Sequence, residues 1–180
     1  DHYKNLHNKL IYIGQIYSSD NNDDNIRAIK KNIDNLEIDY FIYFIEKQCS
    51  LEIISELSKR DNIKLIYNTN RLTFSDYFCF INKYLNNNKI ILSNLDIYFD
   101  YTIKIVKEMN LTKSILALSK NKLYDGIYRL NFNNHQFKFI DDDEIHFWSQ
   151  DTWIFNSPIQ IDSFDDCKFY MGTNGCDNYL

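Results

Sequence analysis

The chain has 180 residues, of which 44% are hydrophobic and 25% charged, and its formal net charge is -5. This length suits one compact domain with a substantial core, and the composition is ordinary for a globular protein rather than a disordered one. The negative charge, and lysine and arginine that are scattered without a basic block, argue against a nucleic-acid binder that relies on phosphate neutralisation. No apolar run approaches the roughly 18 residues that a membrane span needs.

Four cysteines stand at Cys49, Cys79, Cys167 and Cys176, without a CxxC pair or a histidine at metal-ligand spacing. Reduced thiols are therefore expected, and a bridge between Cys167 and Cys176 is left open. No signal segment opens the chain, so we expect a cytoplasmic protein. Abundant asparagine, isoleucine and lysine indicate an AT-rich genome, such as that of a virus. For a viral protein, the expected location would be the host cytoplasm. The start at Asp1 indicates a fragment of a longer protein.

The first hundred residues alternate between apolar strands and amphipathic helices. This alternation predicts right-handed crossovers and a mainly parallel sheet, as in half of a Rossmann-like fold. No GxGxxG follows the first strand and no GxxxxGK[ST] occurs, so ordinary dinucleotide and P-loop binding are disfavoured. The expected strands are Leu10–Tyr17, Asp39–Glu46, Ile63–Tyr67 and the run from Lys89, and the expected helices follow Asp24, Ser50 and Phe74 and end near Asn35, Arg60 and Leu85.

The second half is more mixed in character. A helix is expected over Tyr101–Met109, and an apolar strand over Ser114–Lys120. Short β segments are expected further on, at Tyr128–Phe132, at Gln136–Ile140 and around Trp153–Phe155. The acidic run Asp141–Glu144 is most simply a solvated loop.

The apolar run Lys89-Ile-Ile-Leu ends in Ser93-Asn94-Leu95-Asp96 before it resumes as Ile97-Tyr98-Phe99. On extended chain the side chains of Asn94 and Asp96 point the same way and could share one hard cation. The crevice beyond the carboxyl ends of the strands is also where open α/β sheets bind ligands. The alternative is a simple turn or helix cap.

This segment resembles the DxD region of GT-A glycosyltransferases, with an amide in place of the first acid. The resemblance covers about Leu10 to Leu180 and rests on the order of several motifs. It implies one α/β domain over residues 1–180, with a nucleotide-binding half (1–100) and an acceptor-side half (101–180). Its GT-A sheet would be mainly parallel, with helices on both faces and a small antiparallel part. Mn²⁺ or Mg²⁺ would be held by Asp96 and Asn94.

Four further residues are assigned to the nucleotide by the same resemblance. Gln15 and Tyr17 end the first strand, which lines the base and ribose in that family, and Glu46 ends the second. Arg71 follows the third strand, where its planar fork of donors suits a phosphate. The alternatives are strand-end surface residues and, for Arg71, a surface salt bridge.

Two acids are candidates for catalysis. Aromatic residues frame Gln150 and Asp151, which suits a sugar site with Trp153 as a ligand contact, although a core role for this tryptophan is the alternative. Further on, a segment with Gly172 ends in Asp177. This segment resembles the one that carries the general base of inverting GT-A enzymes, with Asp151 as the second candidate and helix capping as the alternative.

The resemblance therefore implies a small glycosyltransferase that moves a sugar from a nucleotide-sugar, expected to be UDP-linked, to a hydroxyl of a glycan or other acceptor. Inversion is expected because a candidate base exists. A degenerate domain that binds sugar or nucleotide without turnover is one alternative, and a plain interaction module is another. A nucleotidyltransferase is a further one, although that class needs a Gly- and Lys-rich loop after the first strand, where residues 18–24 are acidic.

Overall fold

A computed structural model describes residues 3, 5–17, 23–46, 52–118, 121–122, 128–130 and 150–173. Its centre is a six-stranded sheet with the order β3-β2-β1-β4-β9-β6. The strands β1 to β4 pair in parallel, whereas β9 runs antiparallel to both β4 and β6. The prediction of a mainly parallel α/β sheet is confirmed. The strands are β1 (Leu10–Ile16), β2 (Tyr40–Glu46), β3 (Ile63–Asn68), β4 (Lys89–Ser93), β9 (Thr152–Asn156) and β6 (Ile115–Leu118).

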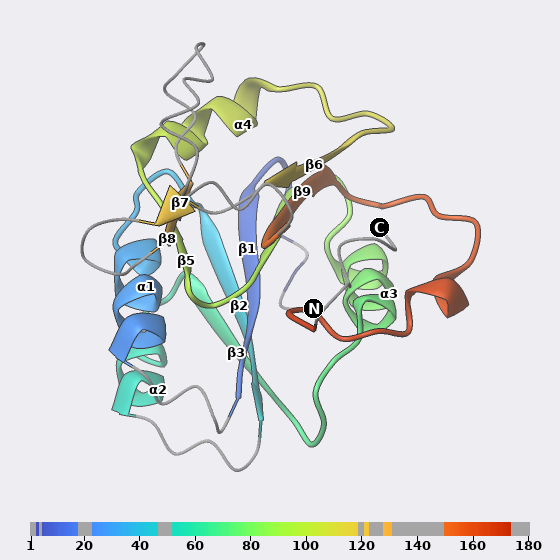
Figure 1. Cartoon of the computed structure of the whole chain (residues 1–180). Coiled ribbons are helices and arrows are strands. Elements are labelled where there is room, and N and C mark those ends of the chain that lie inside the picture. The colour runs from blue at the N-terminus through green and yellow to red at the C-terminus, as the bar shows by residue number, and fades with distance from the viewer. Residues whose placement is uncertain are drawn as a thin grey trace.

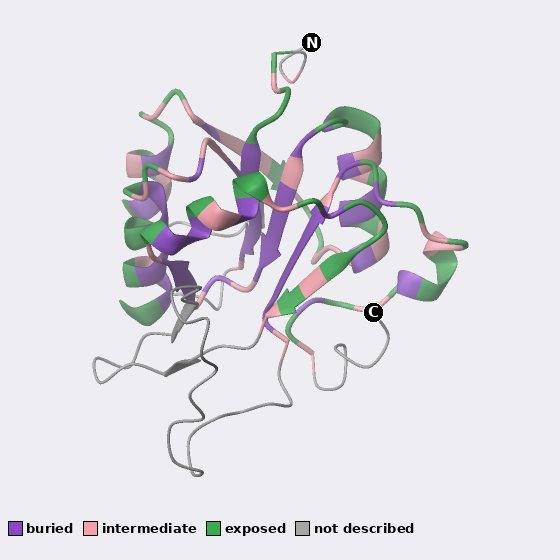
Figure 2. Cartoon of the chain, turned by 90° about the horizontal axis from the view of Figure 1, so that it is seen from above, coloured by how far each residue is buried: buried purple, intermediate pink, exposed green. Residues whose placement is uncertain are grey.

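Helices cover both faces of this sheet (Figure 1), as the fold class predicted. On one face lie α1 (Asp23–Ile33) and α2 (Glu52–Leu57), and on the other lies α3 (Phe74–Tyr84). Successive side chains of a strand point to opposite faces. Tyr12 accordingly belongs to the apolar layer between the sheet and helices α1 and α2, while Ile11 and Ile13 belong to the layer between the sheet and α3. In Figure 2 the central strands are buried and the outer sides of the helices are exposed.

A capping box fixes the start of α3. The Thr73 hydroxyl accepts from the Asp76 backbone N–H at 3.3 Å, and the Asp76 carboxylate accepts from the Thr73 backbone N–H at 2.8 Å. Two of the helix's unpaired N-terminal donors are satisfied in this way. The helix therefore begins at Phe74, beside the expected Ser75, and the loop before it has a defined end.

The run after Asp96 does not continue β4. Residues Ile97–Phe99 form β5, which pairs in parallel with β8 (Tyr128–Leu130) in a separate sheet that also holds β7 (Asn121–Lys122). The side-chain amide of Asn32 in α1 forms hydrogen bonds with backbone groups of β5, as a neighbouring strand would. Its amide donates to the Ile97 carbonyl at 2.8 Å and accepts from the Phe99 N–H at 3.0 Å. A buried polar residue thus attaches the small sheet to helix α1.

The expected helix over Tyr101–Met109 is divided into two short pieces. A 3₁₀ turn spans Tyr101–Lys104, and α4 spans Ile105–Glu108. A second 3₁₀ turn spans Phe164–Cys167. The strand expected over Ser114–Lys120 is present as β6, whereas the segment Gln136–Ile140 and the acidic run Asp141–Glu144 lie outside the described residues.

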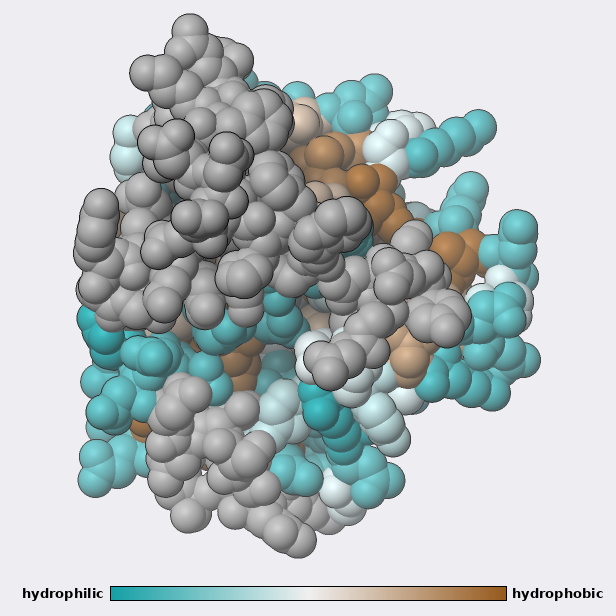
Figure 3. All heavy atoms as spheres, in the orientation of Figure 1, coloured by the Kyte–Doolittle hydropathy of each residue, from teal (hydrophilic) through white to brown (hydrophobic). Residues whose placement is uncertain are grey.

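Cys79 and Cys167 are free thiols, and Cys49 and Cys176 lie outside the described residues. Within the described part of the chain, no helix is long and apolar enough to cross a membrane. On the face shown in Figure 3, hydrophilic residues cover most of the described surface, with smaller hydrophobic areas between them.

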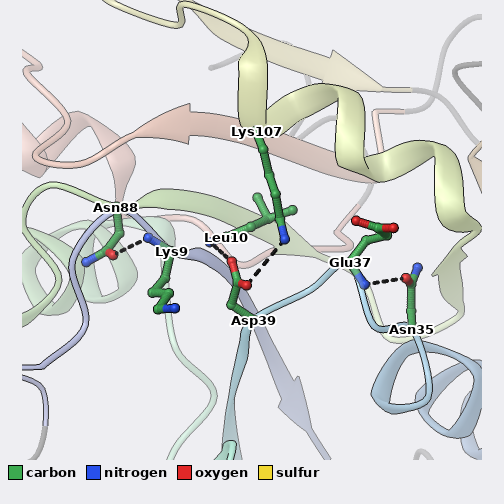
Figure 4. Close-up of polar contacts among 7 residues, drawn as sticks. All are labelled: Lys9, Leu10, Asn35, Glu37, Asp39, Asn88 and Lys107. Carbon is green, nitrogen blue, oxygen red and sulfur yellow. Dashed lines mark hydrogen bonds and ion pairs between the residues drawn. The ribbon is translucent and has the colours of Figure 1, made fainter.

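Polar contacts join the amino ends of the strands (Figure 4). The Asp39 carboxylate accepts from the Leu10 N–H at 2.8 Å and lies 3.3 Å from the Lys107 ammonium. Asn88, which is buried, accepts from the Lys9 N–H at 3.0 Å, and its amide donates to three carbonyl groups. These carbonyls belong to Leu6, Leu85 and Asn86. One side chain thus satisfies the backbone where β1 and β4 begin.

We predict that Asn88→Ala lowers the free energy of unfolding by about 3 kcal/mol, because a buried backbone group left without its partner costs about 1–3 kcal/mol. Urea denaturation followed by circular dichroism measures the change. The control is Asn86→Ala, at an exposed neighbouring side chain. Equal stability of the two variants would contradict the assigned role of Asn88.

Candidate functional site

The carboxyl ends of β1 to β4 meet at one edge of the sheet, because the four strands are parallel. Since β9 is antiparallel, its amino end lies at the same edge, and Ser93 pairs with Thr152. Their hydroxyl oxygens are 2.6 Å apart in the buried interior. The topology therefore places Asn94, which follows β4, beside Asp151, which precedes β9.

Asn94 and Asp151 are joined twice. The Asn94 backbone N–H donates to the Asp151 carbonyl at 3.0 Å, and the Asn94 side-chain amide donates to the Asp151 carboxylate, also at 3.0 Å. Asp151 is only 6% exposed. A buried carboxylate needs hydrogen-bond donors, and Asn94 supplies one of them. The two residues form one unit at the edge of the sheet.

Asn94 and Asp96 do not lie on extended chain, which corrects the premise of the metal prediction. Residues 95 and 96 form a turn, and the Ile97 N–H donates to the Asn94 carbonyl at 3.4 Å. The alternation of side chains along a strand therefore does not apply here, and the turn alternative describes the local structure. Burial raises the pKa of Tyr12 beneath this turn, and the charge of Asp96 raises it further. The Tyr12 hydroxyl thus stays protonated.

Arg71 lies in the loop between β3 and α3, at the same edge. Its guanidinium carbon is 4.6 Å from the centroid of the Tyr17 ring and 5.6 Å from that of Tyr170. One terminal nitrogen donates to the Met171 carbonyl, while Nε is buried without a hydrogen-bond partner among the described residues. Aromatic faces attract a guanidinium and fix its plane. Arg71 is therefore an oriented cation.

The loop that carries Arg71 is attached to β1 by Gln15. The Gln15 carbonyl oxygen accepts from the Leu72 N–H at 2.9 Å and from the Tyr77 hydroxyl at 3.0 Å, and its amide donates to the Asn70 carbonyl at 3.3 Å. Gln15 is 1% exposed. What the structure shows for this residue is a positioning role under Arg71; a contact with nucleotide stays a prediction.

The backbone of residues 169–172, which are distant in sequence, borders the site. The Phe74 N–H donates to the Phe169 carbonyl at 3.0 Å, and Tyr170 forms an isolated bridge with Thr73. Gly172 has a positive φ of 74°. A Cβ there would lie 3.4 Å from Asn94 Oδ1 and 3.5 Å from an Arg71 terminal nitrogen. The glycine lets the backbone approach both side chains.

Trp153 lies in the core. It is 2% exposed, and its ring packs edge-on against Phe74 at 4.8 Å between centroids. The structure shows the core alternative for this tryptophan. Because the ring is buried, a sugar would not reach its face in this arrangement. Its indole nitrogen is buried without a partner among the described residues.

Of the remaining predicted residues, the structure describes Tyr17 and Glu46 but not Asp177. Tyr17 and Glu46 are half-buried at the carboxyl edge, where Glu46 pairs in register with Asn68. Both have further interactions within the protein. Asp177 lies outside the described residues. Of the predicted set, the structure therefore brings Arg71, Asn94, Asp151 and Tyr17 together.

A divalent cation does not fit the Asn94–Asp151 pair as the structure has it. Mg²⁺ and Mn²⁺ take oxygen ligands. Here Asn94 presents its NH₂ group to the carboxylate, and a guanidinium lies on the other side. Among the described residues, no three His, Cys, Asp or Glu side chains are close enough to hold a metal ion. The use of Mn²⁺ or Mg²⁺ stays a prediction.

A hollow of about 430 Å³ lies at the opposite, amino end of the sheet, and Asn88, Lys89 and Lys107 are among its lining residues. The Lys89 ammonium donates to the carbonyls of Val106 and Met109 at 2.6 and 2.7 Å. Burial lowers the pKa of Lys89, while Glu108 opposes this shift. The polar groups here serve the structure itself, so we place the functional site at the carboxyl edge.

Tyr170 and the Met171 carbonyl are contacts of Arg71 that the sequence analysis missed. They lie about a hundred residues from Arg71, and no local pattern links the two segments. Gly172 was the detectable signal, because a glycine allows close backbone approach.

Comparisons with protein-family models and with curated proteins found no match. Among solved structures, the chain is similar to 4-diphosphocytidyl-2C-methyl-D-erythritol synthase from Anaerococcus prevotii DSM 20548. The two share 13% sequence identity, the match covers 88% of this chain and 80% of that chain, and the TM-score is 0.43. A likeness at this level assigns neither an activity nor a site residue.

We predict that Gln15→Leu lowers the free energy of unfolding by about 2–4 kcal/mol, because the Leu72 N–H and the Tyr77 hydroxyl each lose a buried acceptor. Tyr77→Phe removes only one of these bonds and should cost about 1 kcal/mol. In a double-mutant cycle by chemical denaturation, the two substitutions should couple by at least about 0.5 kcal/mol. Strictly additive effects would contradict the bond between the two side chains.

Proposed function

We propose that the chain binds a nucleotide-linked substrate at the carboxyl edge of its sheet and acts as a transferase. The observation that carries this proposal is the convergence of Arg71, Asn94, Asp151 and the Gly172 backbone. They come from four separate segments and meet where open α/β sheets bind their ligands. An oriented cation, an acid and a close backbone face are the groups that a phosphorylated substrate and its reaction need.

Arg71 would bind the phosphates. A guanidinium pairs with phosphate oxygens through parallel N–H bonds, and its strength increases when its plane is fixed. Stacking on Tyr17 and the bond to the Met171 carbonyl supply this fixed plane. Tyr17 and Glu46, at the ends of β1 and β2, stay the proposed contacts of the base and ribose.

Glycosyl transfer is the reaction that the residues favour. An acceptor hydroxyl would attack the anomeric carbon, the bond from this carbon to the diphosphate would break, and the nucleoside diphosphate would leave. The hydroxyl proton would pass to a carboxylate acting as general base. Asp177 is the proposed base through its resemblance to the inverting GT-A segment, and Asp151 is the second candidate.

Nucleotidyl transfer is the second candidate function. The similar synthase from Anaerococcus prevotii is named for a diphosphocytidyl product, and such a product can form when a phosphate displaces pyrophosphate from a nucleoside triphosphate. Against this reaction, residues 18–24 after β1 contain neither glycine nor a basic residue. A domain that binds nucleotide without turnover is the third outcome.

The leaving group separates these functions. The chain is incubated with UDP-, GDP-, dTDP- and CMP-sugars, and separately with nucleoside triphosphates, each with EDTA or Mn²⁺. Release of the nucleoside diphosphate from a UDP-, GDP- or dTDP-sugar, or of CMP from a CMP-sugar, supports glycosyl transfer, whereas release of pyrophosphate from a nucleoside triphosphate supports nucleotidyl transfer. Calorimetric binding without any release identifies the degenerate domain, and no binding at all contradicts the proposal.

Arg71→Gln should weaken binding of the recognised nucleotide at least about tenfold, which corresponds to about 1.4 kcal/mol. Arg71→Lys should recover only part of this loss, because an ammonium keeps the charge but lacks the planar fork. Isothermal titration calorimetry measures both. Lys83→Gln, in the last turn of α3, is the charge-matched control and should bind normally. Unchanged affinity in Arg71→Gln would remove the phosphate role.

Asp177→Asn should leave donor binding intact and lower the rate of transfer by about 10²- to 10⁴-fold, the usual contribution of a general base. Calorimetry and a product-release assay give the two readouts. A fully active Asp177→Asn would move the base to Asp151, for which Asp151→Asn is the matching variant.

A further inference from the structure

Asn94 stands between a carboxylate and a guanidinium. Its NH₂ group donates to Asp151 at 3.0 Å. Its oxygen faces the other way, 3.4 Å from the position that a Cβ on Gly172 would take, and a terminal nitrogen of Arg71 is 3.5 Å from that same position. The oxygen and the guanidinium thus border one small space that the glycine leaves free.

An amide is suited to this place because it carries a donor and an acceptor without charge. A carboxylate at position 94 would face the Asp151 carboxylate at hydrogen-bond distance, and two such like charges repel strongly unless a proton or a cation lies between them. A metal centre built on this pair would require both residues to turn oxygen lone pairs to one ion. In the structure, the NH₂ group of Asn94 already occupies the side that faces Asp151.

We propose that the amide of Asn94 replaces a divalent cation at this edge, and that Arg71 supplies the positive charge for the substrate's phosphates. The site then binds a nucleoside diphosphate without a metal ion, and a single carboxylate at position 94 restores a metal site. This inference rests on the proposed function for its ligand. Its metal arm, however, can be tested without any nucleotide.

The neighbouring charges support this assignment. Arg71 is held by the Met171 carbonyl and two aromatic rings, so its positive charge stays beside the space that the oxygen of Asn94 also borders. A divalent ion at that oxygen would meet the repulsion of this guanidinium. With a carboxylate at position 94, this side chain and Asp151 would supply oxygen ligands from two residues at hydrogen-bond distance from each other.

The first arm titrates the wild-type chain with UDP, GDP, dTDP and CMP by calorimetry, in EDTA and in Mn²⁺. The proposal expects the recognised nucleotide to bind with a Kd that differs by less than about threefold between the two conditions, or less than about 0.7 kcal/mol. Binding that requires Mn²⁺ would overturn the proposal and leave the proposed function standing. Absence of binding in both conditions would count against the proposed function, and the second arm then decides the inference.

The second arm measures Mn²⁺ binding by electron paramagnetic resonance without nucleotide. Asn94→Asp should bind one Mn²⁺ at least about tenfold more tightly than the wild type, and Asp151→Asn in the same chain should abolish this gain. Asn86→Asp, which adds the same charge at an exposed position before β4, is the control and should gain nothing. A wild-type chain that itself binds Mn²⁺ tightly, and loses it with Asp151→Asn, would contradict the proposal, as would an Asn94→Asp variant without a gain.

Discussion

The structure depends on the burial of β1 along its whole length. All seven of its residues are buried, with β2 and β4 on its two sides and apolar layers on its two faces. Polar groups are tolerated in such a strand only when they are hydrogen-bonded, and Gln15 meets this condition through the loop of Arg71. Side chains that could react are thus confined to the ends of the strands. The buried side chain of Gln15 holds the loop that carries one of them, Arg71.

The charged groups at the carboxyl edge are held in place by uncharged neighbours. Arg71 is stacked on Tyr17, and the buried Asp151 accepts from Asn94. The antiparallel insertion of β9 makes this arrangement possible, because it brings residue 151 beside residue 94 from more than fifty positions away. The mainly parallel half of the sheet thus supplies a cation, and the antiparallel part supplies an acid.

The alternation of apolar strands and helices was sufficient to predict the four parallel strands and the placement of helices on both faces, because hydrophobic period and strand length are local properties. The turn at residues 95–96 was one of two alternatives that the sequence left open, since an Asn-x-Asp sequence is compatible with both a strand end and a turn. Trp153 was open between a core and a ligand role, and its packing on Phe74 depends on the tertiary fold. Likewise, the contact of Arg71 with residues 170 and 171 has no local signal. Asp177 and the metal stay predictions.

The most direct test of a nucleotide site at this edge is to map amide ¹H–¹⁵N chemical shifts of the wild-type chain as the recognised nucleoside diphosphate is added. We expect the perturbed amides to gather at residues 15–17, 70–73, 94–96, 151 and 170–172. Perturbations that gather instead around Asn88 and Lys107, at the amino end of the sheet, would contradict it.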